Sequence, residues 1–509
     1  MLVYQVNWVK IWITMNLVRT IYKFLRIRPN WLAPVIIFSV GLILRLYKIN
    51  IGILESAPNR QLIDAVWARN IFRGQYISDF MQGFQLYHWI VAMLYQLAGG
   101  VYEVLGRLVS VSLSFVGAIF FYRLLRGYFN NVVALVGLFF FFILSPIHIV
   151  MSRAFQVDMT ALTLGIIAIY YLHKWNGRNN LYLVISAIFA SLCFLTKITF
   201  AYLLLPIGYI CYQKLGMMMV KRKELYLYLL GVFFPVFIWY DFSRQITLEN
   251  SKFVFQATNW WQVSNWFRAE RLLQNKFYVN IFYFFVQSVV TPIGLVLLPL
   301  VRWRRQKWIG LFYVWFGAAL IYIVALSKVT ISHEYYILVL VPPASALIGV
   351  AVNNLLSKTR ISLHNKSLPM MAMAAFLAIL ATWRVYYFDI YRVPKKHERV
   401  LETAEKVKKF VPSQTQIITT AHNSAVLQYY TDRPGNYLVI YADSQDEVED
   451  RTVKEFERFK RMGAKYYAIS DVSELKENPI FAKHLEQFEL LNPTDSDQFR
   501  IYRLQSVLF

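Results

Sequence analysis

Acidic residues and cysteines are scarce in this 509-residue sequence. It has 29 Asp and Glu against 53 Lys and Arg, two cysteines, and only 16% charged residues. Cys193 and Cys211 both fall in apolar runs, so neither a disulfide framework nor a cysteine metal site is expected. No short apolar segment ends in a small-residue cleavage site, so we expect the first spans to be retained.

Apolar residues dominate what remains. They make up 57% of the sequence, and the mean hydropathy is +0.42. This composition predicts a polytopic α-helical membrane protein with a smaller polar part. The net charge of +24 does not indicate a nucleic-acid partner, because the basic residues lie in short loops between apolar runs, as membrane topology requires.

About 11 apolar runs are candidate membrane spans, each close to the roughly 20 residues needed to cross a bilayer. They lie at Pro34–Tyr47 and near residues 106–125, 131–150, 159–173, 181–196, 199–213, 225–242, 281–301, 308–326, 336–356 and 368–388. Alternation puts the Lys- and Arg-rich loops on one side, where Glu224 is the one acid, and most acidic loop residues on the other. The positive-inside rule therefore predicts a cytoplasmic N-terminus in a plasma-membrane protein.

Three segments lie outside this span pattern. Residues 1–30 are basic and aromatic without acids, typical of a cytoplasmic amphipathic helix on anionic lipid, or of a plain basic tail. In the first outer loop, a segment ending at Phe72 and Leu86–Leu97 predict two interfacial helices. Residues 391–509 are soluble in composition, and we expect them on the outer face, after a membrane domain at 31–390.

The last segment predicts a small α/β domain, because helical and strand patterns alternate along it. No Gly-rich turn indicates a nucleotide site, so this domain is interpreted as a lid or a partner surface. Helices are expected at His397–Phe410, Ser424–Tyr430, Val448–Met462 and Leu475–Phe488, and strands at Gln416–Thr420, Tyr437–Tyr441, Tyr466–Ser470 and Phe499–Leu504.

Two carboxylates of the predicted outer face are the first catalytic candidates. Asp158 follows Ser152 and Arg153 at a junction between apolar runs, and Asp64 lies in the first outer loop. A carboxylate there can take a proton from an acceptor hydroxyl group, or hold a metal ion that activates it. Alternatively, Asp158 caps a helix, and Asp64 pairs with Arg60 four residues earlier.

Four further residues are candidates for binding a lipid phosphate at the same face. Lys197 lies between two spans and can bind a phosphate as a point charge, although snorkelling to headgroups explains it better when it is taken alone. His333, Glu334 and Tyr336 precede a span containing two prolines. An aromatic belt accounts for the tyrosine but not for the His-Glu pair.

These motifs together resemble the GT-C superfamily of polyprenyl-phosphate-sugar-dependent glycosyltransferases, in the branch of the protein O-mannosyltransferases and the lipid A aminoarabinose transferases. The resemblance covers about residues 34–345. It depends on Arg60-Gln61, Ala68-Arg69-Asn70, Gly106-Arg107-Leu108, Ser152-Arg153 with Asp158, Leu195-Thr196-Lys197 and His333-Glu334-Tyr335-Tyr336 before Pro342-Pro343.

The resemblance implies a membrane enzyme that transfers a sugar from a polyprenyl-phosphate donor to a lipid, glycan or protein acceptor on the outer face. It implies that outer-loop acids serve as base or as ligands of a divalent metal, and that basic residues such as Lys197, Arg60 and Arg153 contact the donor. The position of the first-loop acid is occupied here by Ile63 or Asn59, which leaves Asp64 and Glu55 as neighbouring candidates.

Two alternatives remain open from the sequence. A transporter or flippase of lipid-linked sugars would place ionisable groups near the middle of the membrane on broken helices. A binding homologue that has lost its catalytic base is the other alternative, because of the residue at position 63.

Overall fold

The computed structural model describes residues 31–53, 61–74, 83–178, 180–250, 267–301, 309–331, 333–358, 391, 395–421, 425–441, 450–493 and 497–504. These form two compact units. The first contains most described residues up to 358; the second contains those from 391 onward together with residues 51–53 and 61–66. The expected helix at 1–30 and the expected span at 368–388 lie outside the described residues.

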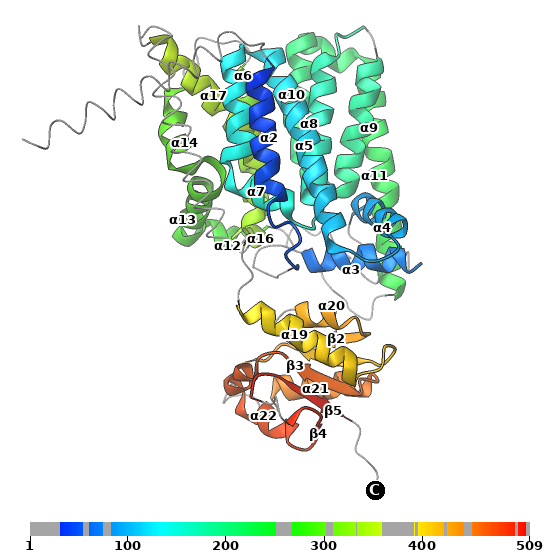
Figure 1. The fold of residues 1–509 in the computed structure, drawn as a ribbon. Coiled ribbons are helices and arrows are strands. Elements are labelled where there is room, and N and C mark those ends of the chain that lie inside the picture. The colour runs from blue at the N-terminus through cyan, green and yellow to red at the C-terminus, as the bar shows by residue number, and fades with distance from the viewer. Residues whose placement is uncertain are drawn as a thin grey trace, which may run out of the picture. The chain divides into compact units, whose positions relative to one another are not determined.

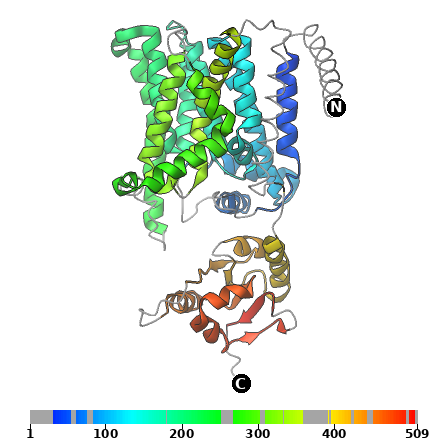
Figure 2. The same ribbon diagram turned by 90° about the vertical axis from the view of Figure 1, so that its left-hand side faces the viewer.

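The first unit is a bundle of apolar helices that run side by side (Figures 1 and 2). Every expected span before residue 360 falls on a helical segment. Within the described chain, five segments are long and apolar enough to cross a membrane, or six if one bent pair is a single span. The bundle helices are α2 (Leu32–Leu46), α5 (Glu103–Tyr128), α6 (Asn131–Phe139), α8 (Asp158–Lys174), α9 (Leu181–Thr196), α10 (Leu204–Leu215), α11 (Lys223–Asn250), α13 (Asn275–Phe284), α14 (Thr291–Leu297), α15 (Gly310–Ala325) and α17 (Val341–Lys358).

One expected span, near residues 131–150, is bent by 57°. Helix α6 passes into the π-helical turn η1 (Phe140–Leu144), and the next helix, α7 (Pro146–Arg153), starts in a new direction. Pro146 causes the break, because it has no N–H group to bond to the preceding turn and holds Ser145 in an extended conformation (φ −82°, ψ 106°). A second π-helical turn, η6 (Phe285–Val290), ends in the same way before Pro292, at Thr291 (φ +61°).

Small and hydroxyl-bearing residues let the central helices approach closely. The hydroxyl group of Thr163 on α8 donates to the carbonyl oxygen of Leu113 on α5 (2.9 Å), and that of Ser186 on α9 donates to Ala168 on α8 (2.8 Å). Both hydroxyl groups are satisfied by backbone of a neighbouring helix, as packing in an apolar medium requires. Helix α8 is consequently buried along most of its length.

Short helices gather at one end of the bundle. Helix α4 (Leu86–Ala98) lies there with α7, α12 (Ala269–Leu272) and α16 (Ser327–Thr330) (Figure 1). Helix α4 and α3 (Gln61–Phe72) coincide with the two helices expected in the first outer loop. Residues of this end of the bundle form the candidate site.

The second unit contains a five-stranded sheet in the order β2-β1-β3-β5-β4. Strand β1 pairs in parallel with β2 and β3, and β5 is antiparallel to β3 and β4. Phe456 and Phe481 cover one face together with Tyr467 of β3. The elements are α19 (Lys395–Phe410), β1 (Ile417–Thr420), α20 (Val426–Thr431), β2 (Gly435–Tyr437), α21 (Arg451–Arg461), β3 (Tyr466–Ile469), η11 (Val472–Glu477), α22 (Pro479–Leu485), β4 (Glu489–Leu490) and β5 (Arg500–Arg503).

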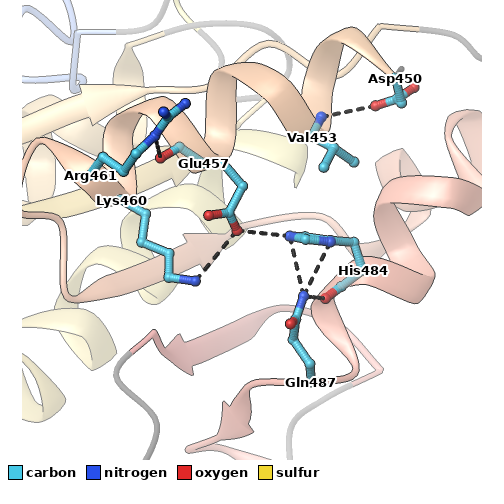
Figure 3. Close-up of polar contacts among 7 residues, drawn as sticks. All are labelled: Asp450, Val453, Glu457, Lys460, Arg461, His484 and Gln487. Atoms are coloured by element: carbon cyan, nitrogen blue, oxygen red, sulfur yellow. Dashed lines mark hydrogen bonds and ion pairs between the residues drawn. The ribbon is translucent and has the colours of Figure 1, made fainter. Parts of the chain in front are cut away.

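A polar cluster links α21 to α22 on the same unit (Figure 3). The carboxylate of Glu457 lies 3.0 Å from Nε2 of His484 and 3.4 Å from Nζ of Lys460. The side-chain amide of Gln487 also contacts the His484 ring. These side chains are partly exposed, so the cluster contributes modestly to holding the two helices together.

Candidate functional site

Asp158 is the first residue of α8, and it does not act as a helix cap. The N-cap is Val157, which has no side-chain cap bond. The short turn between α7 and α8 instead brings Gln156 against the carboxylate, where its Nε2 donates to Oδ2 of Asp158 at 2.7 Å. The Asp158 side chain is only 4% exposed, so its charge requires partners inside the protein.

Lys197 supplies that partner from the end of α9. Its Nζ lies 2.5 Å from Oδ1 of Asp158. The backbone between α9 and η2 (Ile198–Leu203) is extended at this residue. The hydroxyl group of Tyr240 on α11 accepts the next N–H, that of Ile198, at 3.1 Å. The lysine is therefore aimed inward by its backbone rather than snorkelling to headgroups.

Two tyrosine rings also pack beside the ammonium group of Lys197. The ammonium group lies 5.1 Å from the ring centre of Tyr335 and 4.9 Å from that of Tyr336. The two rings stack with centroids 4.6 Å apart, and His333 packs against both. Cation–π attraction stabilises a positive charge at this place. These rings come from η10 (Glu334–Leu340) and the residue before it.

Glu334 faces a different part of the same region. Its carboxylate accepts a hydrogen bond from the hydroxyl group of Ser288 in η6. The carbonyl oxygen of Ser288 in turn accepts from the hydroxyl group of Ser145 (3.4 Å). The two helix breaks therefore meet near Glu334. This residue directly precedes Tyr335 and Tyr336 in the sequence, but its carboxylate contacts Ser288.

Arg153 binds backbone carbonyl groups at the end of α2. Its guanidinium group donates to backbone carbonyl groups in and just after the last turn of that helix, where carbonyl groups need partners from outside the helix. Tyr47 accepts at 2.7 Å, and Leu44 and Lys48 accept at 3.2 Å. Arg45 accepts as well. These contacts assign Arg153 a structural role, as a cap that ties α7 to α2.

Close backbone approaches explain two glycines near the site. A Cβ on Gly106, at the start of α5, would lie 2.1 Å from the ring of Phe155 in the turn before Asp158. A Cβ on Gly83 would lie 2.2 Å from the carbonyl oxygen of Thr196, directly before Lys197. Only glycine fits at either place without displacing the site.

The catalytic candidates of the first outer loop are not part of the site described in the first unit. Asp64 lies on α3 and is 5% exposed, and it belongs to the second compact unit, whereas Asp158 belongs to the first. Glu55 and Arg60 lie outside the described residues. Of the predicted catalytic acids, the site described here contains only Asp158, and the role of a first-loop acid stays a prediction.

The described residues do not fit a bound metal ion. No three His, Cys, Asp or Glu side chains converge among them in a way that could hold one. Asp158, the carboxylate that a metal would need, is occupied by Lys197 and Gln156.

Gln156 and Ser288 were not predicted from the sequence as members of the site, and Tyr335 was named only within the His333–Tyr336 motif. Ser288 lies in an apolar run far from any charged residue of the sequence, so no local signal marks it. A pattern that could have found Gln156 is its position two residues before a buried aspartate, where a turn can bring both side chains together.

One protein-family model and several solved structures resemble the chain. Residues 85–240 match the sequence model of the family described as dolichyl-phosphate-mannose-protein mannosyltransferase. No curated protein sequence matches the chain.

Solved structures match over nearly the whole chain. ArnT from Cupriavidus metallidurans bound to undecaprenyl phosphate is 13% identical with a TM-score of 0.62, covering 93% of this chain and 98% of that chain. The apo state of the same protein is 14% identical with a TM-score of 0.64, covering 92% of this chain and 97% of that chain. A third match is AglB, an archaeal oligosaccharyltransferase from Archaeoglobus fulgidus, in complex with an inhibitory peptide and a dolichol-phosphate. It is 12% identical with a TM-score of 0.54, covering 88% of this chain and 70% of that chain.

The fold and the site define a helical membrane protein, with five or six candidate spans among the described residues and a charged pair at one end of the helices. The fold is that of ArnT and AglB, and the predicted resemblance to the GT-C superfamily is confirmed by these matches and by the family model.

Proposed function

We propose that the protein is a glycosyltransferase of the plasma membrane that moves a sugar from a polyprenyl-phosphate carrier to an acceptor on the outer face. The observation that carries this proposal is the buried pair of Asp158 and Lys197, 2.5 Å apart. ArnT and AglB have this fold and bind a polyprenyl or dolichol phosphate, according to their descriptions.

Lys197 is the group that receives the phosphate. Its ammonium group is held between the carboxylate of Asp158 and the rings of Tyr335 and Tyr336. An anionic phosphate competes with Asp158 for this cation, and cation–π contacts keep the cation in place during the exchange. Binding of the donor therefore releases Oδ1 of Asp158.

The released carboxylate can then act as a base. The acceptor hydroxyl group loses its proton to Asp158 and forms a bond to the anomeric carbon, while the bond from that carbon to the phosphate oxygen breaks. The leaving polyprenyl phosphate keeps the bonding electrons, and Lys197 stabilises its charge. Asp64 and Glu55 remain the proposed alternatives for the base, because a first-loop acid serves in the resembled branch.

Reconstitution tests the proposal. The purified protein in vesicles is given undecaprenyl phosphate carrying a radiolabelled hexose or pentose, with a membrane extract as acceptor. We expect loss of label from the lipid and release of undecaprenyl phosphate, both absent with Asp158→Asn. Binding of the lipid with neither transfer nor translocation would instead establish the impaired binding homologue.

A transporter is the second candidate, because two helices are broken beside a buried carboxylate. The breaks at Ser145 and Thr291 meet near Glu334, and irregular backbone that lines a binding site is typical of transporters. Movement of the intact labelled lipid between leaflets, without release of its sugar, would favour this function.

A further inference from the structure

Gln156 has a fixed orientation beside the catalytic candidate. Its side chain is buried, at 1% exposure, and lies 2.7 Å from Oδ2 of Asp158. A carboxylate only accepts hydrogen bonds, so the donating Nε2 must face Asp158. The carbonyl oxygen, Oε1, is attached to the same carbon and consequently lies close to the carboxylate.

Oε1 of Gln156 is a buried acceptor with no hydrogen-bond partner among the described residues. Buried polar atoms are nearly always paired, because an unpaired one loses its hydration without compensation. This atom therefore points to a donor group that binds here. The two carboxylate oxygens of Asp158 are divided between Gln156 on one side and Lys197 on the other.

We propose that Gln156 binds the sugar that is transferred: its Oε1 accepts a hydrogen bond from a sugar hydroxyl group, while its Nε2 holds Asp158. This inference rests on the proposed function. If the donor phosphate binds Lys197, the attached sugar lies next to the Asp158 carboxylate. An ionised phosphate diester and an isoprenoid chain carry no hydrogen-bond donor, so only the sugar of that ligand can satisfy Oε1.

A binding experiment separates the sugar from the lipid. Affinities of the full-length protein are measured for undecaprenyl phosphate and for the same lipid carrying hexoses or pentoses. We expect wild type to bind at least one sugar-bearing lipid more tightly than bare undecaprenyl phosphate. In Gln156→Met this affinity ratio should fall by about threefold to tenfold, as the loss of one hydrogen bond predicts. Binding of bare undecaprenyl phosphate should stay unchanged in this variant.

The matched control is Gln245→Met. Gln245 also donates to an aspartate, with Nε2 3.0 Å from Oδ2 of Asp241, but this pair is exposed on α11. Its loss should change neither affinity. Thermal unfolding of both variants in detergent establishes that they fold.

A second variant keeps the acceptor atoms and removes the donor. In Gln156→Glu, the introduced carboxyl group can donate to Asp158 only when it is protonated. Transfer by this variant should therefore rise relative to wild type as the pH falls, which a merely structural role would not produce. Lys197 contacts Asp158 directly, and Tyr322 interacts with it electrostatically. The rings of Tyr335 and Tyr336 lie beside Lys197.

Three outcomes overturn the inference. A folded Gln156→Met variant that keeps the full sugar preference shows that Oε1 binds water only. Equal loss of both lipids shows that Gln156 acts solely through Asp158 and Lys197. A wild-type protein that binds every lipid without preference for a sugar excludes a sugar contact, whereas failure to bind bare undecaprenyl phosphate contradicts the proposed function itself.

Discussion

Nζ of Lys197 and Oδ1 of Asp158 meet at 2.5 Å although 39 residues separate them in the chain. The contact joins the end of α9 to the start of α8. Neither group can be removed without leaving the other charged and poorly hydrated, which makes each substitution informative about ligand binding as well as about the pair.

Lys197→Met is expected to weaken binding of undecaprenyl phosphate by about 1.5–3 kcal/mol, the range for a hydrogen bond to a charged group. This corresponds to roughly a tenfold to hundredfold higher Kd. Lys174→Met is the control, because Lys174 also lies near a tyrosine ring, that of Tyr170 (5.8 Å), at the other end of α8. Equal affinities of wild type and Lys197→Met, measured by scintillation proximity, would leave Lys197 with a structural role only.

Asp158→Asn is expected to abolish transfer while the protein stays folded. The amide keeps the shape of the side chain but cannot accept a proton from the acceptor. Binding of undecaprenyl phosphate should not weaken, because Lys197 no longer has a competing carboxylate. The control is Asp241→Asn, at an exposed pair with Arg244. Normal turnover by Asp158→Asn in the vesicle assay would rule out the site described here.

Asp64→Asn tests the first-loop acid. If Asp64 is the general base, transfer should fall by about 10²-fold or more. Asp64 is 5% exposed, so the unfolding temperature of the variant must be compared with that of wild type. Normal transfer by Asp64→Asn would direct the same test to Glu55→Gln.

The element ranges were largely predictable because hydrophobic runs and periodicity are local properties. The expected helix at Leu475–Phe488 is divided because Pro479 starts a new helix at an Asn478 cap. Strand β4 was missed, since its two residues are too short to show alternation. The expected strand at Tyr437–Tyr441 forms earlier, at Gly435–Tyr437, because pairing with Ile417–Thr419 decides its register.

The candidate site was predictable only in part. Asp158 and Lys197 were both identified, since charges at the ends of apolar runs stand out in sequence. Their mutual contact was not predicted, because it depends on the packing of α8 against α9. The roles of Gln156 and Arg153 depend on a turn and a helix end that only the folded chain brings together.

Arg153→Met tests the cap assigned to that residue. Loss of its contacts with the carbonyl groups of Tyr47, Leu44 and Lys48 should destabilise the protein by about 3 kcal/mol, within the range for lost buried networks. Arg126→Met is the control, since Arg126 makes an exposed side-chain bond to Asn131. An unchanged unfolding temperature together with weaker undecaprenyl phosphate binding would return Arg153 to the phosphate-binding group.

The last prediction concerns which side of the membrane carries the site. Both native cysteines are buried, so single introduced cysteines can be labelled against a low background. Positions for them should be exposed: Tyr102 (51%) and Leu273 (86%) on the predicted outer side, and Met217 (74%) on the predicted cytoplasmic side. An impermeant maleimide applied to intact cells should label Tyr102→Cys and Leu273→Cys at once, and Met217→Cys only after permeabilisation, because the Lys- and Arg-rich loop around Met217 is retained inside. Labelling of Met217→Cys in intact cells would reverse the orientation. Labelling of only one of the other two would instead change the number of spans between them.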